Sequence, residues 1–274
     1  MCIRDSAKPL AALLDHWGHL PEINKNTALP RVTADGVKHF KDLDVYLFAR
    51  GDWRGTVSAY DAEYHYKYDF RQASGGALCV IYNNKVGLLC AASMAEYSLV
   101  EKNNQQAQPG KDICLTPRIE TFKDDVWYTN LYDLPATVAS KDENGAIELR
   151  ADVKLKNVDR EEVEGTASAF DIAYNCTANK TEIKVTTKQD IKEQTAFVLP
   201  IVSPSNEAVT NISENEITIQ KPEGLVTIKA STPIKVKELP GKRTFNMVPG
   251  VEALPLEVFF VGDTKHVSIT ITVS

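Results

Sequence analysis

A cluster of tyrosines around one histidine is the stretch of this sequence whose side chains are best suited to chemistry. Tyr64, His65, Tyr66 and Tyr68 lie close together and are followed by Asp69. Tyrosine rings stack on sugar rings, and an imidazole can accept or donate a proton near neutral pH. We therefore expect His65 to be a catalytic residue and the three tyrosines to bind substrate. Alternating tyrosines are also typical of a half-exposed strand, which is the alternative.

Trp53 and Arg54 precede this cluster and offer two further binding groups. An indole ring provides a flat platform for a sugar, and a guanidinium binds a carboxylate through two parallel hydrogen bonds. We expect both residues to bind substrate. The alternative is that Trp53 packs in the core and Arg54 faces solvent.

Two nearby carboxylates suggest a different chemistry. Asp61 and Glu63 are two positions apart, so on a strand they share a face and could act as acid and base in a small hydrolase. Ion pairing with Arg54 or Arg71 is the alternative for this pair.

Motifs for metals, cofactors and phosphates are lacking in the sequence. Histidines and carboxylates do not have the spacing of a metal site, and the nucleophile elbow Gly-x-Ser-x-Gly does not occur. Ser74, Gly75 and Gly76 are not followed by the residues of a phosphate loop, so these glycines predict a bulge or a close backbone approach. We expect neither a metal nor another cofactor.

The elements that must position these residues are strands. From Val37 onward, apolar or alternating runs recur roughly every 8–12 residues between turn-forming residues, which is typical of an antiparallel β-sandwich. Ala77–Tyr82 and Val86–Ala92 should pair as a hairpin across a tight turn. Further strands are expected over residues 147–155, 224–230, 256–261 and 266–273.

The first 35 residues differ from the rest. Residues 1–6 resemble a translated sequencing-adapter artefact, residues 7–20 have apolar side chains at helical spacing, and residues 22–35 are polar and linker-like. A single helix with an apolar face needs something to pack against. We therefore expect a truncated protein, with an artefactual start, a terminal helix and a linker over residues 1–35 and one sandwich domain over residues 36–274.

Composition narrows the range of partners. The net charge is −6 and the sequence has no basic stripe, so we expect no nucleic acid as a partner. No apolar run reaches the roughly 20 residues of a membrane span. Five cysteines are too few and too scattered for a disulfide scaffold. We expect Cys79 and Cys90 to be buried free thiols, with a bridge between them as the alternative.

The chain as a whole resembles the C-terminal part of heparinase II/III-like polysaccharide lyases. The terminal helix AKPLAALLDHW, the linker, the strand VYLFARGDW and the segment SGGALCVIYNNKVGLLCAASMAEYSLVE carry the resemblance. It implies an all-β fold, a large antiparallel β-sandwich, with a short N-terminal helix left from a missing α-helical toroid domain.

The resemblance also implies β-elimination on a polysaccharide that contains uronic acid. A base removes the proton at C5, an acid protonates the leaving oxygen, and the charge that develops at the carboxylate is neutralised. In this family most catalysts lie on the toroid and the sandwich adds one histidine, to which His65 corresponds. Tyr64 and Tyr66 stand where the family has further histidines, and Ala73 where it has aspartate, so the structural zinc of some members is not expected here.

We therefore expect a periplasmic or secreted protein whose partners are an acidic polysaccharide or oligosaccharide and the missing helical domain. This chain alone should be inactive, because a cleft between two domains needs both of them. The main alternative is a non-catalytic carbohydrate-binding or structural β-sandwich module.

Overall fold

The computed structural model describes residues 28–61, 74–93, 95, 98–101, 104–106, 114–237, 244–245 and 252–274. Contacts divide the chain into two compact units, residues 1–33 and residues 34–274. The described part of the first unit holds one short helix, α2 (Pro30–Thr33). The helix predicted over residues 7–20 lies outside the described residues, and the predicted boundary after residue 35 stays a prediction.

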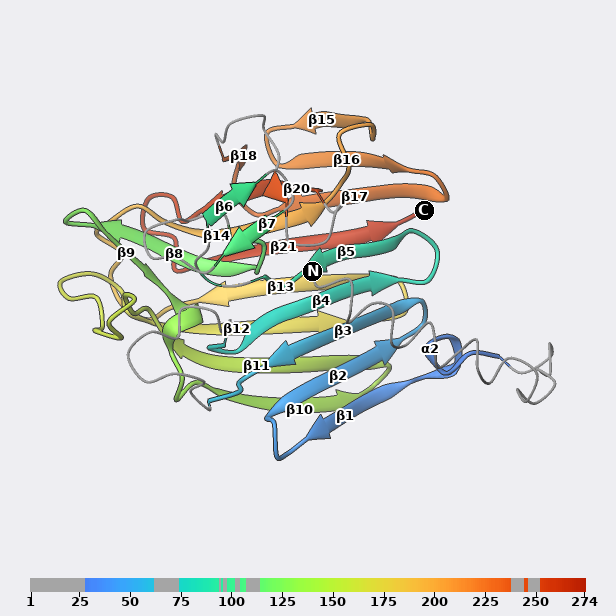
Figure 1. Ribbon diagram of the computed structural model, residues 1–274, viewed down its shortest axis with the longest axis horizontal. Coiled ribbons are helices and arrows are strands. Elements are labelled where there is room, and N and C mark those ends of the chain that lie inside the picture. Colours follow the sequence, from blue (N-terminus) through green and yellow to red (C-terminus); the bar gives the residue numbers. More distant parts are fainter. Residues whose placement is uncertain are drawn as a thin grey trace. The chain divides into compact units, whose positions relative to one another are not determined.

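An eight-stranded antiparallel sheet forms the largest layer of the second unit (Figure 1). Its strands lie in the order β10-β11-β12-β13-β21-β17-β16-β15. Their bounds are β10 (Thr137–Glu143), β11 (Ala146–Lys154), β12 (Ala169–Cys176), β13 (Lys180–Thr186), β21 (His266–Val273), β17 (Gly224–Ala230), β16 (Glu216–Lys221) and β15 (Val209–Ser213).

Two smaller sheets complete the sandwich. The five-stranded sheet follows chain order: β1 (Gly36–Phe40), β2 (Val45–Arg50), β3 (Trp53–Ser58), β4 (Ala77–Asn83) and β5 (Gly87–Ala91). The six-stranded sheet has the path β18 (Ile234–Val236), β20 (Glu252–Phe259), β14 (Thr195–Val202), β8 (Arg118–Lys123) and β9 (Val126–Thr129), with β19 (Thr244–Phe245) beside β20. A separate pair consists of β6 (Ser98–Glu101) and β7 (Asn104–Gln106), and the 3-10 helix η2 spans Asn130–Tyr132.

One hydrophobic core joins the eight-, five- and six-stranded sheets. On β11 the side chains alternate, because successive residues of a strand point to opposite faces. Its buried side chains are Ile147, Leu149, Ala151 and Val153. The residues between them are polar and partly or fully exposed, so this sheet has one core face and one outer face. Burial of each large apolar side chain stabilises the fold by about 1.5–3 kcal/mol, and the predicted all-β sandwich is confirmed.

Two buried tyrosines tie the five-stranded sheet to the eight-stranded sheet. The Tyr46 hydroxyl on β2 donates to the carbonyl oxygen of Val138 on β10 at 2.8 Å. The Tyr174 hydroxyl on β12 donates to the carbonyl oxygen of Gly76 at 2.9 Å, and burial raises the pKa of Tyr174. A buried hydroxyl without a partner would destabilise the fold, so these bonds fix how the two layers face each other.

The β4–β5 hairpin is confirmed, and its register settles the state of two cysteines. Cys90 lies opposite Ile81, not Cys79, and both thiols are free. The alternative of a bridge between them is therefore wrong. Free thiols are confirmed, but only Cys90 is fully buried and Cys79 is partly exposed. Burial raises the pKa of Cys79 to about 11.

Several strands differ from their prediction, among them β20 and β1. β20 begins at Glu252, several residues before the predicted start at residue 256. Pro255 lies inside β20 and faces Pro200 of β14. Proline cannot donate a backbone hydrogen bond, so each of these two residues costs its neighbour nothing in the ladder by facing the other. β1 was not predicted at all, because it is short and none of its residues is fully buried.

None of the helices in the described ranges is both long and apolar enough to cross a lipid bilayer.

Candidate functional site

Trp53 and Arg54 are the sequence-predicted site residues that the structure describes. Trp53 is 1% exposed and belongs to the hydrophobic core, so its ring offers no free face to a ligand. Arg54 is partly buried, and its Nη1 donates to the carbonyl oxygens of Gly51 at 2.7 Å and Trp53 at 2.6 Å. We assign Trp53 a packing role, whereas substrate binding by Arg54 stays a prediction.

The tyrosine cluster lies outside the described residues. This holds for His65, Tyr64, Tyr66 and Tyr68, so their predicted roles stay predictions. The structure does describe the residues on both sides of it. The Ser74 hydroxyl donates to the carbonyl oxygen of Tyr60, so the described residues that flank the cluster lie next to each other.

A close backbone approach fixes the position of Gly75 just before β4, as the two glycines predict. The Asn130 side chain donates through Nδ2 to the carbonyl oxygen of Gly75 at 2.9 Å and accepts through Oδ1 from the N–H of Ile119 at 2.8 Å. Gly75 has a φ of +67°, and a Cβ there would lie 1.7 Å from the carbonyl oxygen of Asn130. Glycine is therefore required at this position.

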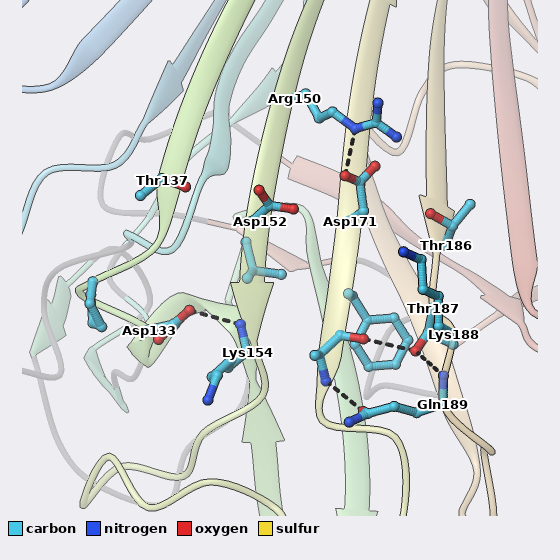
Figure 2. Close-up of a pocket in the computed structure, with 14 residues that line it drawn as sticks. Asp133, Thr137, Arg150, Asp152, Lys154, Asp171, Thr186, Thr187, Lys188 and Gln189 are labelled. Carbon is cyan, nitrogen blue, oxygen red and sulfur yellow. Dashed lines mark hydrogen bonds and ion pairs between the residues drawn. The ribbon is translucent and has the colours of Figure 1, made fainter.

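A groove of about 970 Å³ crosses the outer face of the eight-stranded sheet, over β10, β11, β12 and β13 (Figure 2). Its lining residues fall within 133–137, 150–154, 169–171 and 186–189. The volume lies in the roughly 300–1,000 Å³ range typical of ligand sites. Phe170, Val153 and Pro135 give the groove apolar surface, while most of the other lining residues are charged or carry a hydroxyl or amide.

Two aspartates face each other across the groove. Asp152 on β11 pairs directly with Asp171 on β12 in the strand register. Arg150 Nε lies 2.5 Å from Asp171 Oδ2 and neutralises that carboxylate. The Asp152 side chain has no hydrogen bond or ion pair to any residue in the described ranges, although its charge attracts Arg150 at longer range. Like charges directly opposite each other destabilise a sheet, so this arrangement is not one that folding alone favours.

Gln189 and Thr187 shape the groove beside β13. Gln189 Oε1 accepts from the backbone N–H of Ser168 at 2.7 Å and of Ala169 at 2.9 Å. Both partners are donors, so the amide oxygen must be the atom that faces them, and the NH₂ group is left with two donors. The Thr187 hydroxyl donates to the carbonyl oxygen of Ala169 at 2.8 Å, which holds β12 against this turn.

Asp133 lies on the other side of the groove in Figure 2 and anchors β11. Its Oδ2 accepts from the N–H of Lys154 at 2.7 Å, and its Oδ1 lies 2.9 Å from Lys156 Nζ. The Lys154 ammonium lies 2.8 Å from Glu162 Oε2. Hydrogen bonds from Lys154 and Ser168 hold the pKa of Glu162 below its ordinary value. This end is thus a network of paired charges.

The groove can bind a hydroxyl-rich ligand that also carries charge. It combines a carboxylate acceptor, amide and ammonium donors and apolar surface, which match the hydroxyls, acidic groups and C–H faces of a sugar chain. No group of three or more His, Cys, Asp or Glu that could hold a metal ion occurs among the residues that the structure describes. Asp61, the described member of the predicted carboxylate pair, is not among the lining residues.

Sequence reasoning missed this groove. The alternation of charged residues along β11 was visible, but it is equally typical of any solvated strand face. What makes the site is the register that places Asp152 opposite Asp171, together with a turn that brings residues 186–189 beside them. Those are properties of three paired strands, not of one segment.

Comparisons with known proteins point to one family. A family model described as ulvan lyase C-terminal domain matches residues 37–274. The chain is 66% identical over 267 residues to a broad-specificity ulvan lyase of Formosa agariphila, covering 97% of this chain and 42% of that protein. The chain therefore spans less than half the length of this relative.

Solved structures share the fold. A heparinase III superposes with a TM-score of 0.60 at 11% identity, covering 98% of this chain and 41% of that one. A heparan sulfate lyase HepC mutant from Pedobacter heparinus superposes with a TM-score of 0.54 at 10% identity, covering 98% and 40%. At such identities the likeness speaks for the β-sandwich alone.

Proposed function

The chain belongs to the ulvan lyase C-terminal domain family, and we propose from this that it acts as the C-terminal domain of an enzyme that cleaves ulvan. One observation carries the proposal: 66% identity to a broad-specificity ulvan lyase extends over 97% of this chain. The partner in catalysis would be a preceding helical domain, and the substrate an acidic polysaccharide outside the cytoplasm, in the periplasm or secreted medium.

The proposed reaction is β-elimination at a uronic acid. A base takes the C5 proton, the electron pair forms the C4–C5 double bond, and the bond from C4 to the glycosidic oxygen breaks. An acid protonates that oxygen as it leaves. Charge that develops on the uronate carboxylate is stabilised by cations or hydrogen-bond donors.

The tyrosine-rich segment is our candidate for the contribution of this chain to that site. His65 supplies an imidazole for proton transfer, and Tyr64, Tyr66 and Tyr68 supply ring faces and hydroxyls. Support comes from the described residues at its base, where the Ser74 hydroxyl binds the carbonyl oxygen of Tyr60. A catalytic segment requires rigidly held ends, since displacement of a reacting group by about 1 Å can lower the rate 10²-fold.

A chimera tests the proposed activity. We would join this chain to the part of the Formosa agariphila relative that it does not cover, and follow the ultraviolet absorbance of unsaturated uronate products from ulvan. We expect product from the chimera and none from this chain alone. A folded chimera without product, beside an active parent relative, would overturn the lyase proposal, and product from the chain alone would overturn its expected inactivity.

A substitution in the same chimera tests the role of His65. His65→Gln should lower kcat by about 10²–10⁴-fold with a smaller change in KM, the size typical of a lost proton-transfer residue. His266→Gln, at the start of strand β21, is the matched control and should leave kcat unchanged. Equal rates for both variants would remove His65 from the mechanism.

A further inference from the structure

We propose that the groove over β10–β13 binds a stretch of acidic polysaccharide through Asp152, Lys188 and Gln189, at a site that includes none of the residues predicted from the sequence. The identity of the ligand rests on the proposed function, whereas the existence of the site rests on the groove itself. Figure 2 shows these three residues among the side chains that line it.

The first argument is that the groove holds charged groups without partners. Asp152 and Lys188 are both exposed, and neither has a hydrogen bond or ion pair to the residues that the structure describes. The Thr186 hydroxyl, also in the lining, likewise has no hydrogen-bond partner among the described residues. By contrast, Arg150 and Lys154 are paired to Asp171 and Glu162. The unpaired groups are therefore available to a ligand.

The second argument is the conflict between Asp152 and Asp171. Two carboxylates that face each other across adjacent strands repel, and Arg150 forms its ion pair with only Asp171, while its attraction to Asp152 is the weaker one. Local conflicts with folding are expected mainly where function requires them. The Asp152 carboxylate interacts with Arg150 only through longer-range attraction and has no donor among the described residues. It can therefore accept hydrogen bonds from two adjacent hydroxyls of a sugar, which gives Asp152 a role that packing does not.

The third argument is the position of donors and apolar surface around that carboxylate. The free NH₂ group of Gln189 can donate to a sugar hydroxyl or ring oxygen, because its Oε1 is already held by the N–H groups of Ser168 and Ala169. The Lys188 ammonium provides the charge that a uronate carboxylate requires. Pro135 offers an exposed apolar edge on which the C–H face of a sugar can lie.

The charge balance of the groove limits which ligands fit. Its lining holds three cationic residues, Arg150, Lys154 and Lys188, and three anionic ones, Asp133, Asp152 and Asp171. These charges cancel, so a polyanion gains no general attraction of the kind that basic patches provide. The ligand must therefore combine hydroxyls with spaced acidic groups, which is the pattern of a uronate-containing sugar chain and not of a dense polyanion.

Binding of size-fractionated ulvan oligosaccharides to this chain, measured by calorimetry, tests the proposal. Asp152→Asn and Lys188→Gln should each weaken binding about tenfold, the size of one lost charge-assisted hydrogen bond. The matched controls are Glu182→Gln and Lys184→Gln, which alter outward residues of β13 that do not line the groove and should bind as the parent does. Carboxyl-reduced oligosaccharides should lose the dependence on Lys188 but keep the dependence on Asp152.

A stability measurement separates a binding role from a structural one. Asp152→Asn removes the repulsion with Asp171, so its Tm should equal or exceed that of the parent while its affinity falls. No binding by the parent chain, or parent-like affinity of both groove variants, would overturn the site. If the groove variants fail this test but the chimera cleaves ulvan, the lyase proposal holds and the groove proposal is wrong. If the groove binds oligosaccharide but the folded chimera does not cleave ulvan, the groove proposal holds and the lyase proposal is wrong.

Discussion

At the scale of single residues, the most consequential charges lie in the six-stranded sheet and take no part in the groove. Glu120 is 7% exposed and receives hydrogen bonds from Arg118 Nε at 2.8 Å and from Lys237 Nζ at 2.7 Å. Burial by itself raises the pKa of Glu120, but the attraction of Arg118 and Lys237 and their hydrogen bonds outweigh it and hold the pKa below its ordinary value. Glu120 is therefore charged in the folded protein.

Replacement of this carboxylate should be among the most destabilising single changes. Glu120→Gln leaves the buried Arg118 without its anion and leaves Lys237 only the more distant Glu257, 3.9 Å away. We expect the free energy of unfolding to fall by about 3–5 kcal/mol at neutral pH. Glu143→Gln, which breaks an exposed pair with Lys141, should change it by at most about 1 kcal/mol. Urea unfolding of the three proteins measures both values.

The pH dependence of the same variant has a definite sign. Because the folded-state pKa of Glu120 lies below its unfolded-state value, its contribution is fully present above the unfolded-state pKa and is lost as the pH falls through the folded-state pKa. The difference in the free energy of unfolding between the parent and Glu120→Gln should therefore become smaller as the solution is acidified. A difference in the free energy of unfolding that stays constant down to strongly acidic pH would contradict this account.

At the scale of elements, the glycine that opens β4 should be irreplaceable for two separate reasons. Gly75→Ala introduces a Cβ against the carbonyl oxygen of Asn130 and also strains a backbone with φ of +67°. Gly145→Ala has the strain alone, since its φ is +76° and a Cβ there meets nothing within 4 Å. We expect the free energy of unfolding to fall by about 1–2 kcal/mol for Gly145→Ala and by more than about 4 kcal/mol for Gly75→Ala.

Denaturant unfolding measures this difference. Equal decreases in the free energy of unfolding for the two glycine variants would mean that the backbone near Asn130 shifts to make room for the new Cβ without a large loss of stability. A loss confined to Gly75→Ala would mean instead that the contact, not backbone strain, sets the requirement.

The elements that the sequence predicts well are those whose pattern is local. Residues 224–230 and 266–273 alternate cleanly, and β17 and β21 have those bounds. β20 is longer than the predicted strand over residues 256–261, and its Pro255 pairs with Pro200, so the two residues without N–H groups face each other. Such compensation between distant segments cannot be seen in either segment alone.

The candidate site was less predictable for the same reason. The sequence left two roles open for Trp53, a platform for a sugar or a side chain of the core. Only the packing of three sheets decides between these roles. Asp152 and Lys188 looked like ordinary solvated residues of separate segments. Their common environment depends on the pairing of β11, β12 and β13 and on the turn that follows β13.

At the scale of the whole molecule, the described cysteines report on global unfolding. Cys79, Cys90, Cys114 and Cys176 are free, and burial raises the pKa of Cys79 and of Cys176 to about 11. The thiolate is the reactive form, so these groups should react slowly in the native protein. In a Cys2→Ser variant we expect no rapid thiol labelling at mildly alkaline pH and four labelled thiols after denaturation. Rapid native labelling would show that the core opens locally.

The same β-sandwich fold occurs in enzymes that are only about one-tenth identical to this chain, such as the heparinase III structure at 11% identity. A sandwich of this kind therefore does not specify a substrate, and discrimination has to come from surface residues and connecting segments.

The anchored base at Tyr60 and Ser74 has a consequence for evolution and for protein engineering. A hydrogen bond joins these two residues, and a second one joins Asn130 to Gly75, so the described ends of β3 and β4 are held together on their own. We therefore expect that residues 62–73 can be exchanged as a cassette without rebuilding the strands on either side. Transplanting this cassette between relatives is a direct route to altered polysaccharide preference on one unchanged scaffold.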